Sequence, residues 1–201
     1  MNAAVARIGA GVEVVSVLAF AVCVLIDYDF GSYLSGIFIA FGFVMLIAGF
    51  HAECDPEHKA ASLVALVLSG IYAVLILLVY YAQTTAVRLH GLGEEALDII
   101  DFNRFGLFFG YDQLGYGIMG LATFFTGLTI RAATKADRWL KGLLIAHGAV
   151  FPACFLIPML GVFHPGLESA AWIGRLVLVA WCAYYLPICV LSYLHFARES
   201  F

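Results

Sequence analysis

The stretch ASLVALVLSGIYAVLILLVYYA, residues 61–82, decides the fold class of this chain, because it contains no charged residue. A helix needs about 20 mostly apolar residues to cross the hydrocarbon core of a membrane. Backbone amides in lipid must be satisfied within the spanning segment, which favours a helix over an isolated strand. Residues 61–82 are therefore predicted to form a transmembrane helix.

Five further segments satisfy the same criterion, and the whole composition agrees with them. The chain is 64% hydrophobic and 12% charged, whereas soluble domains carry roughly 25% charged residues. We therefore predict an all-α, polytopic integral membrane protein, with residues 1–201 forming a single transmembrane domain that is a six-transmembrane-helix bundle. Membrane lipids are then its first partners. The six predicted spans are 8–26, 33–50, 61–82, 112–130, 140–160 and 170–196.

Positive charge predicts the orientation of these spans. Cytoplasmic loops carry an excess of Lys and Arg, and the loop RAATKADRWLK at 131–141 alone holds four of the ten Lys and Arg residues in this chain. This loop follows an even number of spans, so both termini are predicted to be cytoplasmic. The outer loops are acidic, and no basic stretch suits a nucleic-acid partner.

The long outer loop at 84–111 carries an unusual pattern. Within it, LGEEALDIIDFNRFGLFF at 92–109 alternates charged and apolar residues at near-helical spacing. Such a segment is typical of an interfacial helix, so we predict an interfacial helix or lid between the third and fourth spans. The alternative is an ordinary connecting loop whose apolar residues have no functional role.

The stretch FFGYDQLGYG at 108–117 places a carboxylate at the start of the fourth span. A charged side chain at the centre of a membrane helix costs roughly 2.5–3.5 kcal/mol on insertion scales, so it faces the bundle interior or a wet cavity. Asp112, Tyr116 and Thr123 share one face of this helix. Tyr80 and Gln83 continue a similar polar face of the third span.

Arg175 lies early in the sixth span, at about the depth of Asp112. We predict an Asp112–Arg175 pair that lines an outward-facing pocket. The predicted ligand-binding residues are Asp112, Arg175, Gln83, Tyr80, Tyr116 and Thr123. Two alternatives stay open: the pair only holds two helices together, or Arg175 extends unpaired to the membrane surface.

A second polar group is expected near the cytoplasmic side. Glu13 and His147 enter their spans to similar depth, and they could form a proton-active or a purely structural pair. His51 and His195 sit at the inner ends of the second and sixth spans. Together with His147, these histidines are the weaker candidates for a metal or haem site. The main prediction includes no cofactor.

Prolines at positions 152, 158 and 187 lie within predicted spans and indicate kinks in the fifth and sixth helices.

No HExxH, GxSxG or Walker A motif is present, so the sequence predicts no catalytic residue. We expect a protein that binds or transports a small or lipidic molecule through the polar pocket. The alternatives are an intramembrane redox, metal or haem enzyme that uses Glu13 and the histidines, and an accessory subunit. The chain works alone, as a homo-oligomer or in a larger membrane complex.

Overall fold

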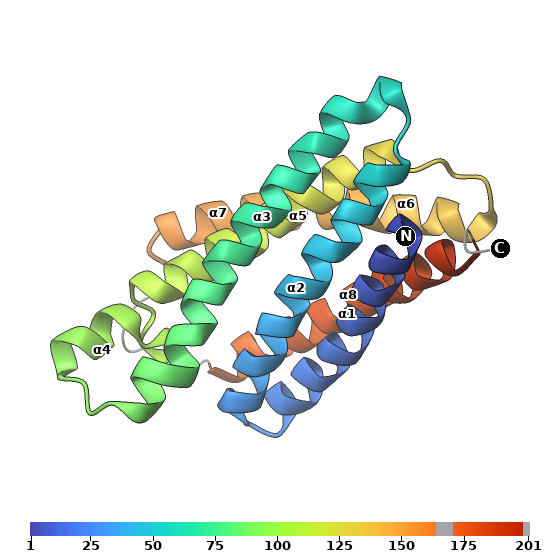
Figure 1. Cartoon of the computed structure of the whole chain (residues 1–201). Coiled ribbons are helices and arrows are strands. Elements are labelled where there is room, and N and C mark those ends of the chain that lie inside the picture. Colours follow the sequence, from blue (N-terminus) through green and yellow to red (C-terminus); the bar gives the residue numbers. More distant parts are fainter. Residues whose placement is uncertain (164–170, 199–201) are drawn as a thin grey trace.

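The fold is seen in a computed structural model that describes residues 1–163 and 171–198. These residues form helices and turns, with no strand among them. Residue 170, the first of the sixth predicted span, lies outside the described residues. The long helices run side by side as a bundle, with the start of α1 (Asn2–Leu25) and the end of α8 (Ala171–Arg198) at one end and α4 (Glu94–Ile100) at the other (Figure 1). We call these the terminal end and the α4 end.

Eight α-helices and three short helical turns follow one another along the described chain. The turns are the 3-10 helices η1 (Pro56–His58) and η3 (Phe102–Arg104) and the π-helical turn η2 (Gln83–Val87). The α-helices are α1 (Asn2–Leu25), α2 (Asp29–Glu53), α3 (Lys59–Ala82), α4 (Glu94–Ile100), α5 (Leu107–Thr129), α6 (Lys135–His147), α7 (Val150–Met159) and α8 (Ala171–Arg198).

Five helical segments of the described chain are long and apolar enough to cross a membrane. They are α1, α2, the segment Pro56–Val87 around α3, the segment Lys135–Met159 with α6 and α7, and α8 from Trp172. The all-helical fold class is confirmed for the described residues, and the five apolar segments are compatible with a helical membrane bundle. The predicted fourth span, α5, is not among the five, because Asp112, Gln113 and several glycines lower its mean hydropathy.

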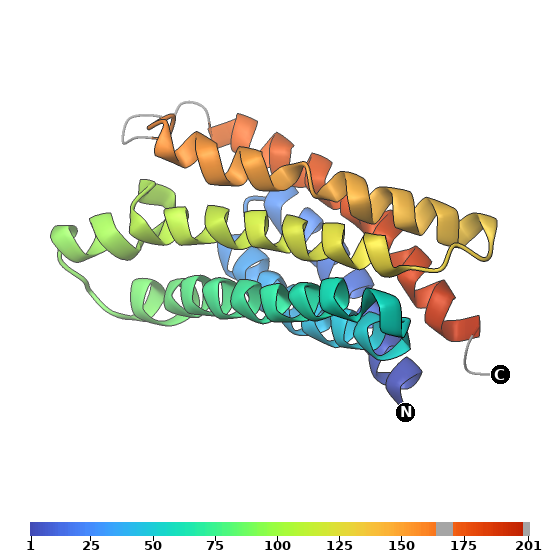
Figure 2. The same ribbon diagram turned by 90° about the horizontal axis from the view of Figure 1, so that it is seen from above.

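The helices follow one another around a closed ring. α1 packs against α2 and α8, α2 against α3, and α3 against α5; α5 packs against α6 and α7, and α6 against α8. Figure 2 shows α5 lying between α3 on one side and α6 with α7 on the other. The long helix that is not among the five apolar segments is thus covered by its neighbours, and its polar face points into the ring.

Small residues bring α1 and α2 into close contact. A Cβ atom at Gly9 would lie 2.7 Å from the carbonyl oxygen of Gly42, and one at Gly49 would lie 2.2 Å from Cβ of Ala6. Glycine and alanine at such crossings let helix backbones approach within the membrane. A Cβ atom at Gly42 would also lie 2.8 Å from Cγ of Glu13. The crossing therefore holds the Glu13 side chain in the core.

The predicted span 140–160 consists of two helices, because α6 ends at His147 and α7 begins at Val150. Pro152 has no N–H to donate to the carbonyl of Gly148, four residues earlier. The interruption therefore follows from the proline that predicted a kink. Pro158 lies in the last turn of α7, and Pro187 lies inside a continuous α8.

Candidate functional site

Asp112 lies in the second turn of α5, facing into the ring, and is only 2% exposed. The Tyr80 hydroxyl of α3 lies within hydrogen-bonding reach of its carboxyl group. The Tyr80 hydroxyl lies 3.2 Å from the hydroxyl of Tyr116, one turn further along α5. Oδ1 of Asp112 has no hydrogen-bond partner. The structure thus brings together three of the predicted residues, Asp112, Tyr80 and Tyr116, and leaves one carboxyl oxygen unused.

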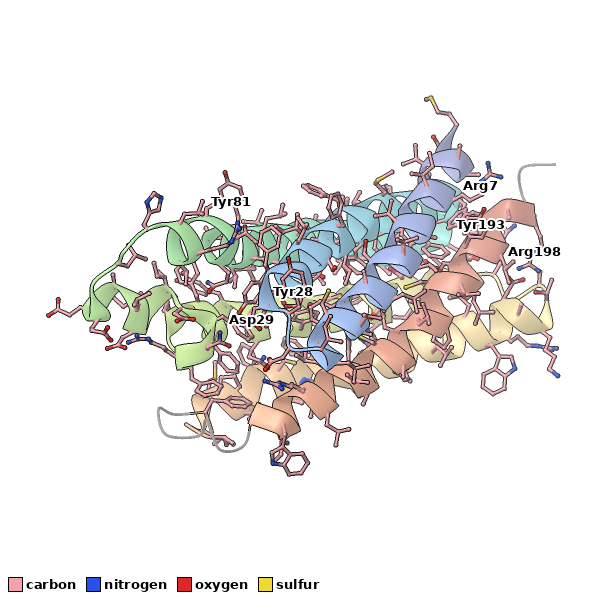
Figure 3. All side chains as sticks on the ribbon, turned by 90° about the horizontal axis from the view of Figure 1, so that it is seen from below. Arg7, Tyr28, Asp29, Tyr81, Tyr193 and Arg198 are labelled. Carbon is pink, nitrogen blue, oxygen red and sulfur yellow. The ribbon has the colours of Figure 1, made fainter. Side chains whose placement is uncertain are left out.

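Local packing explains why Tyr80 points inward. Tyr80 is 2% exposed, whereas the next residue, Tyr81, is 66% exposed and points away from the bundle (Figure 3). A Cβ atom at Gly36 of α2 would lie 2.1 Å from the Tyr80 ring. The ring of Tyr80 therefore fits against α2 because position 36 has no side chain.

The predicted Asp112–Arg175 pair is wrong. Arg175 Nη2 lies 2.6 Å from Oδ1 of Asp27, in the turn between α1 and α2, and the Arg175 side chain is 46% exposed. α8 packs mainly against α1 and α6 rather than α5, so Arg175 meets the α1–α2 turn. Within residues 1–163 and 171–198, no basic side chain forms an ion pair with Asp112 or with Glu13.

Gln83 is buried, and both ends of its side-chain amide are hydrogen-bonded to backbone groups. Its Nε2 donates a hydrogen bond to the carbonyl oxygen of Ile100 at 2.7 Å, and its Oε1 accepts one from the backbone N–H of Phe102 at 3.1 Å. Both partners belong to residues 93–106, which contain α4 and η3 and which we call the cover segment. Gln83 therefore fastens the cover segment to the end of α3.

Aromatic rings continue this attachment towards Asp112. The ring centroid of Phe102 lies 5.9 Å from that of Tyr33 on α2, and the Tyr33 ring lies 5.4 Å from that of Tyr80. Phe102 also contacts Phe109, near the start of α5, with centroids 5.2 Å apart. The cover segment thus packs over the α4 end of the site: its Phe102 contacts Tyr33, and Tyr33 contacts Tyr80.

The cover segment also has its own internal contacts. Arg104 donates hydrogen bonds to Glu94 and Asp98, both at 2.7 Å. The bonds to Asp98 and Glu94 raise the pKa of Arg104 above its usual range. Phe105 adopts a left-handed backbone conformation with φ of 56°. A Cβ atom at Gly106 would lie 2.0 Å from the carbonyl oxygen of Asp98, so the return of the chain towards α5 requires glycine there.

Thr123 contributes to a different group from the one predicted. The indole N–H of Trp181 donates to Nε2 of His147 at 3.1 Å, so Nε2 carries no proton. The ring proton of the neutral imidazole is then on Nδ1, which donates to the Thr123 hydroxyl at 2.9 Å. That hydroxyl donates in turn to the carbonyl oxygen of Gly120 at 2.8 Å. Each member of this group is satisfied, and Thr123 orients His147.

Glu13 and His147 do not form the predicted pair. Glu13 is completely buried; its Oε1 accepts a hydrogen bond from Tyr185 at 2.8 Å, and its Oε2 has no partner. Tyr185 lies between the two residues, with its ring centroid 5.4 Å from that of His147. It also stacks on Trp181 at 5.1 Å. Ring packing, rather than a direct hydrogen bond, connects Glu13 to the imidazole.

The three histidines do not converge on one point. His51 Nδ1 lies 2.8 Å from the Ser62 hydroxyl, and His195 bridges two carboxylates, with Nδ1 3.0 Å from Asp137 and Nε2 2.8 Å from Glu53. In the described part of the chain, one group of three has its ligand atoms within 4.8 Å of one another: Asp55, Glu57 and His58. It lies at the exposed turn η1, and none of the predicted histidines belongs to it.

A cavity of about 320 Å³ lies at the terminal end. Its charged lining includes Glu53, Asp137, His195 and Arg198. Arg198 Nη2 lies 2.7 Å from Asp137, and its side chain is 44% exposed. The cavity therefore reaches the surface at the end where Arg7, Tyr193 and Arg198 lie in Figure 3.

Sequence reasoning missed the contribution of α8. Trp181, Tyr185, Cys189 and Ser192 follow one another at helical spacing, and all except the half-buried Trp181 are buried. This spacing was a usable signal, but apolar residues on every side of α8 obscure it. Tyr72, two turns before Tyr80 on α3, also faces the core, and its hydroxyl has no partner.

Comparison of the chain with protein-family models, with curated proteins and with solved structures finds no match.

Proposed function

We propose that the chain is a membrane protein that binds and transports a small or lipidic molecule carrying an ammonium group, with Asp112 as the anchor. The observation that carries the proposal is the buried carboxyl group without a counter-charge and with Oδ1 unpartnered. Ionisable side chains within transmembrane segments are commonly part of a substrate or ion pathway. In this proposal α5 also crosses the membrane, so that it and the five more apolar segments give six spans in all.

The surroundings of Asp112 support a cationic group on the ligand. The rings of Tyr33, Tyr80, Tyr116 and Tyr72 form one connected cluster beside it. Aromatic faces attract ammonium groups, by up to about 2 kcal/mol when the contact is desolvated. A carboxylate and several tyrosine rings together therefore favour an ammonium group over an anion or a neutral apolar molecule.

In the proposal the cover segment acts as a lid. Asp112, Tyr80 and Gln83 are all buried, so a ligand reaches Asp112 from the α4 end only when the cover segment moves. The Gln83 hydrogen bonds and the Phe102 ring contacts are the attachments that such a movement would break. The positive charge of residues 131–141 supports placing the terminal end in the cytoplasm and the lid outside.

The alternatives have weaker support. A haem or metal enzyme would require His147 to give up its hydrogen bond from Trp181, and His195 to give up at least one carboxylate. An accessory subunit without a ligand would use Asp112 only for assembly. It therefore predicts that ammonium compounds do not affect the isolated protein.

Thermal unfolding of the purified protein in detergent tests the proposal. The probes are ethylammonium, choline and ethanolamine, compared with sodium chloride at the same ionic strength. A ligand at 100 times its Kd stabilises the folded state by about 2.7 kcal/mol. We expect at least one probe to raise the Tm of the wild type and to leave that of Asp112→Asn unchanged.

Asp55→Asn is the matched control, because Asp55 forms an ion pair with Arg131 at the terminal end. This variant should respond to the probe as the wild type does. The proposal is contradicted if no probe raises the Tm, or if Asp112→Asn gains as much from the probe as the wild type.

A further inference from the structure

Four buried polar atoms in the described residues have no hydrogen-bond partner. They are Oε2 of Glu13, the hydroxyl of Tyr72, Oδ1 of Asp112 and the hydroxyl of Ser192. Leaving one such group unpaired costs about 1–3 kcal/mol, and unpaired groups in a native structure call for an explanation. These four atoms come from α1, α3, α5 and α8, and all of them lie inside the ring.

Neighbouring buried polar side chains form a series that we call the row. Its first part runs between α3 and α5. The Tyr80 hydroxyl lies within hydrogen-bonding reach of Asp112 and 3.2 Å from the hydroxyl of Tyr116. The Tyr116 ring contacts the ring of Tyr72, with centroids 6.0 Å apart. Tyr72 and Tyr80 are separated by eight positions, or about 12 Å along a helix. This part covers the half of the core nearer the α4 end.

The second part of the row runs along α8. The Tyr72 ring contacts Phe43 of α2, with centroids 5.2 Å apart, and the neighbouring Gly42 closely approaches Glu13, whose carboxyl group accepts the hydrogen bond from Tyr185. From Tyr185, the buried Cys189 and Ser192 continue the same face of α8 over about 10 Å. His195, one further turn along, lines the cavity at the terminal end. The row therefore ends where the cavity reaches the surface.

We infer that these residues form a proton path from Asp112 to the terminal-end cavity, with Tyr72 and Glu13 as its central members. Carboxylates and histidines at both ends of a buried hydroxyl row are the components of intramembrane proton relays. The unpartnered atoms are the positions at which internal water completes the row, since a buried water needs two to four polar partners. The inference does not depend on the ligand proposed for Asp112.

Each step of the path conserves protons. A hydroxyl oxygen accepts one proton and releases its own proton to the next oxygen, and it then rotates back to its starting orientation. At Glu13 the carboxyl group takes up a proton on one oxygen and releases one from the other. Glu13 is faced by Tyr185 and Cys189 from α8, while α2 presents Gly42. Tyr72 of α3 is among the electrostatic neighbours of Glu13.

Proton flux into liposomes tests the path directly. The purified full chain is reconstituted with a pH-sensitive dye inside, and a potassium gradient with valinomycin supplies the driving force. Protein-containing liposomes should acidify faster than protein-free ones. Gln83→Ala, which loosens the cover segment at the other end of the path, should increase the flux further.

Two substitutions remove single atoms or charges from the path. Tyr72→Phe removes only the hydroxyl, and Glu13→Gln keeps the shape of the side chain; both should reduce the flux to the protein-free level. The matched controls are Tyr81→Phe, on the lipid-facing side of α3, and Glu57→Gln, at the exposed turn η1, and both should conduct as the wild type does. Thermal unfolding and size-exclusion chromatography verify that each variant is folded.

The inference is overturned by either of two results. One is that the wild type and Gln83→Ala both match protein-free liposomes. The other is that Tyr72→Phe and Glu13→Gln, shown to be folded, conduct as the wild type does. The test with ammonium probes on Asp112→Asn is independent of this assay, so a failure here and a failure of the proposed ligand site are distinguishable.

Discussion

Replacing Gln83 with alanine should release the cover segment without disturbing the rest of the bundle. The side chain makes two hydrogen bonds to this segment, at 2.7 Å and 3.1 Å. Each hydrogen bond contributes about 0.5–1.5 kcal/mol, so Gln83→Ala should lower the free energy of opening of residues 93–106 by about 1–3 kcal/mol. Backbone amides of this segment should then exchange with deuterium about 5- to 150-fold faster.

Hydrogen–deuterium exchange read by mass spectrometry measures this change, with peptides from α1 and α2 as internal references. Gln113→Ala is the matched control, because Gln113 is the other glutamine of the chain and is half-buried on α5. Its exchange over residues 93–106 should equal that of the wild type. Unchanged exchange in Gln83→Ala, or equal acceleration in both variants, would refute the role of Gln83 as the attachment.

Three further substitutions test individual contacts by thermal unfolding. Asp27→Asn should cost no more than about 1 kcal/mol, because its ion pair with Arg175 is largely exposed; a much larger loss would indicate a buried partner for Arg175. Gly36→Ala should destabilise the protein by about 1–3 kcal/mol, since Tyr80 must move to admit the new methyl group, and an unchanged Tm would contradict that packing. Thr123→Val should cost about 1–3 kcal/mol by leaving a buried imidazole N–H unpaired, whereas Thr126→Val should not affect that imidazole.

The helices could be predicted from the sequence because hydropathy and length decide whether a segment suits the membrane. The predicted 33–50 and 61–82 lie inside α2 and α3, and 8–26 matches α1 to within one residue at its far end. The polar face of α5 was also predictable, since helical spacing alone places Asp112 and Tyr116 on one side. These features depend only on residues close together in the chain.

The partners of the charged residues could not be predicted in the same way. Depth places Arg175 and Asp112 at one level, but the order of helices around the ring determines which side chains meet. α8 packs beside α1 and α6, and this order carries no local sequence signal. The same reason explains why His147 contacts Trp181 and Thr123 instead of Glu13.

The role of Gln83 depended on the path of the cover segment. Sequence spacing predicts an interfacial helix at 92–109, and α4 with η3 occupies that range. The return of the chain over the end of α3 depends on the left-handed Phe105 and the close approach at Gly106. Neither conformation follows from hydropathy, so the sequence alone predicts that Gln83 lines a pocket.

Infrared spectroscopy observes directly whether the Asp112 carboxyl group binds the ligand. The protein is labelled with ¹³C at the aspartate carboxyl carbons, and the difference spectrum is recorded on addition of the ammonium probe that raises the Tm. If the ligand binds at Asp112, the wild type shows a shifted aspartate carboxyl band, and this band is absent from the spectrum of Asp112→Asn. A spectrum without any aspartate change, or the same change in Asp112→Asn, would contradict it.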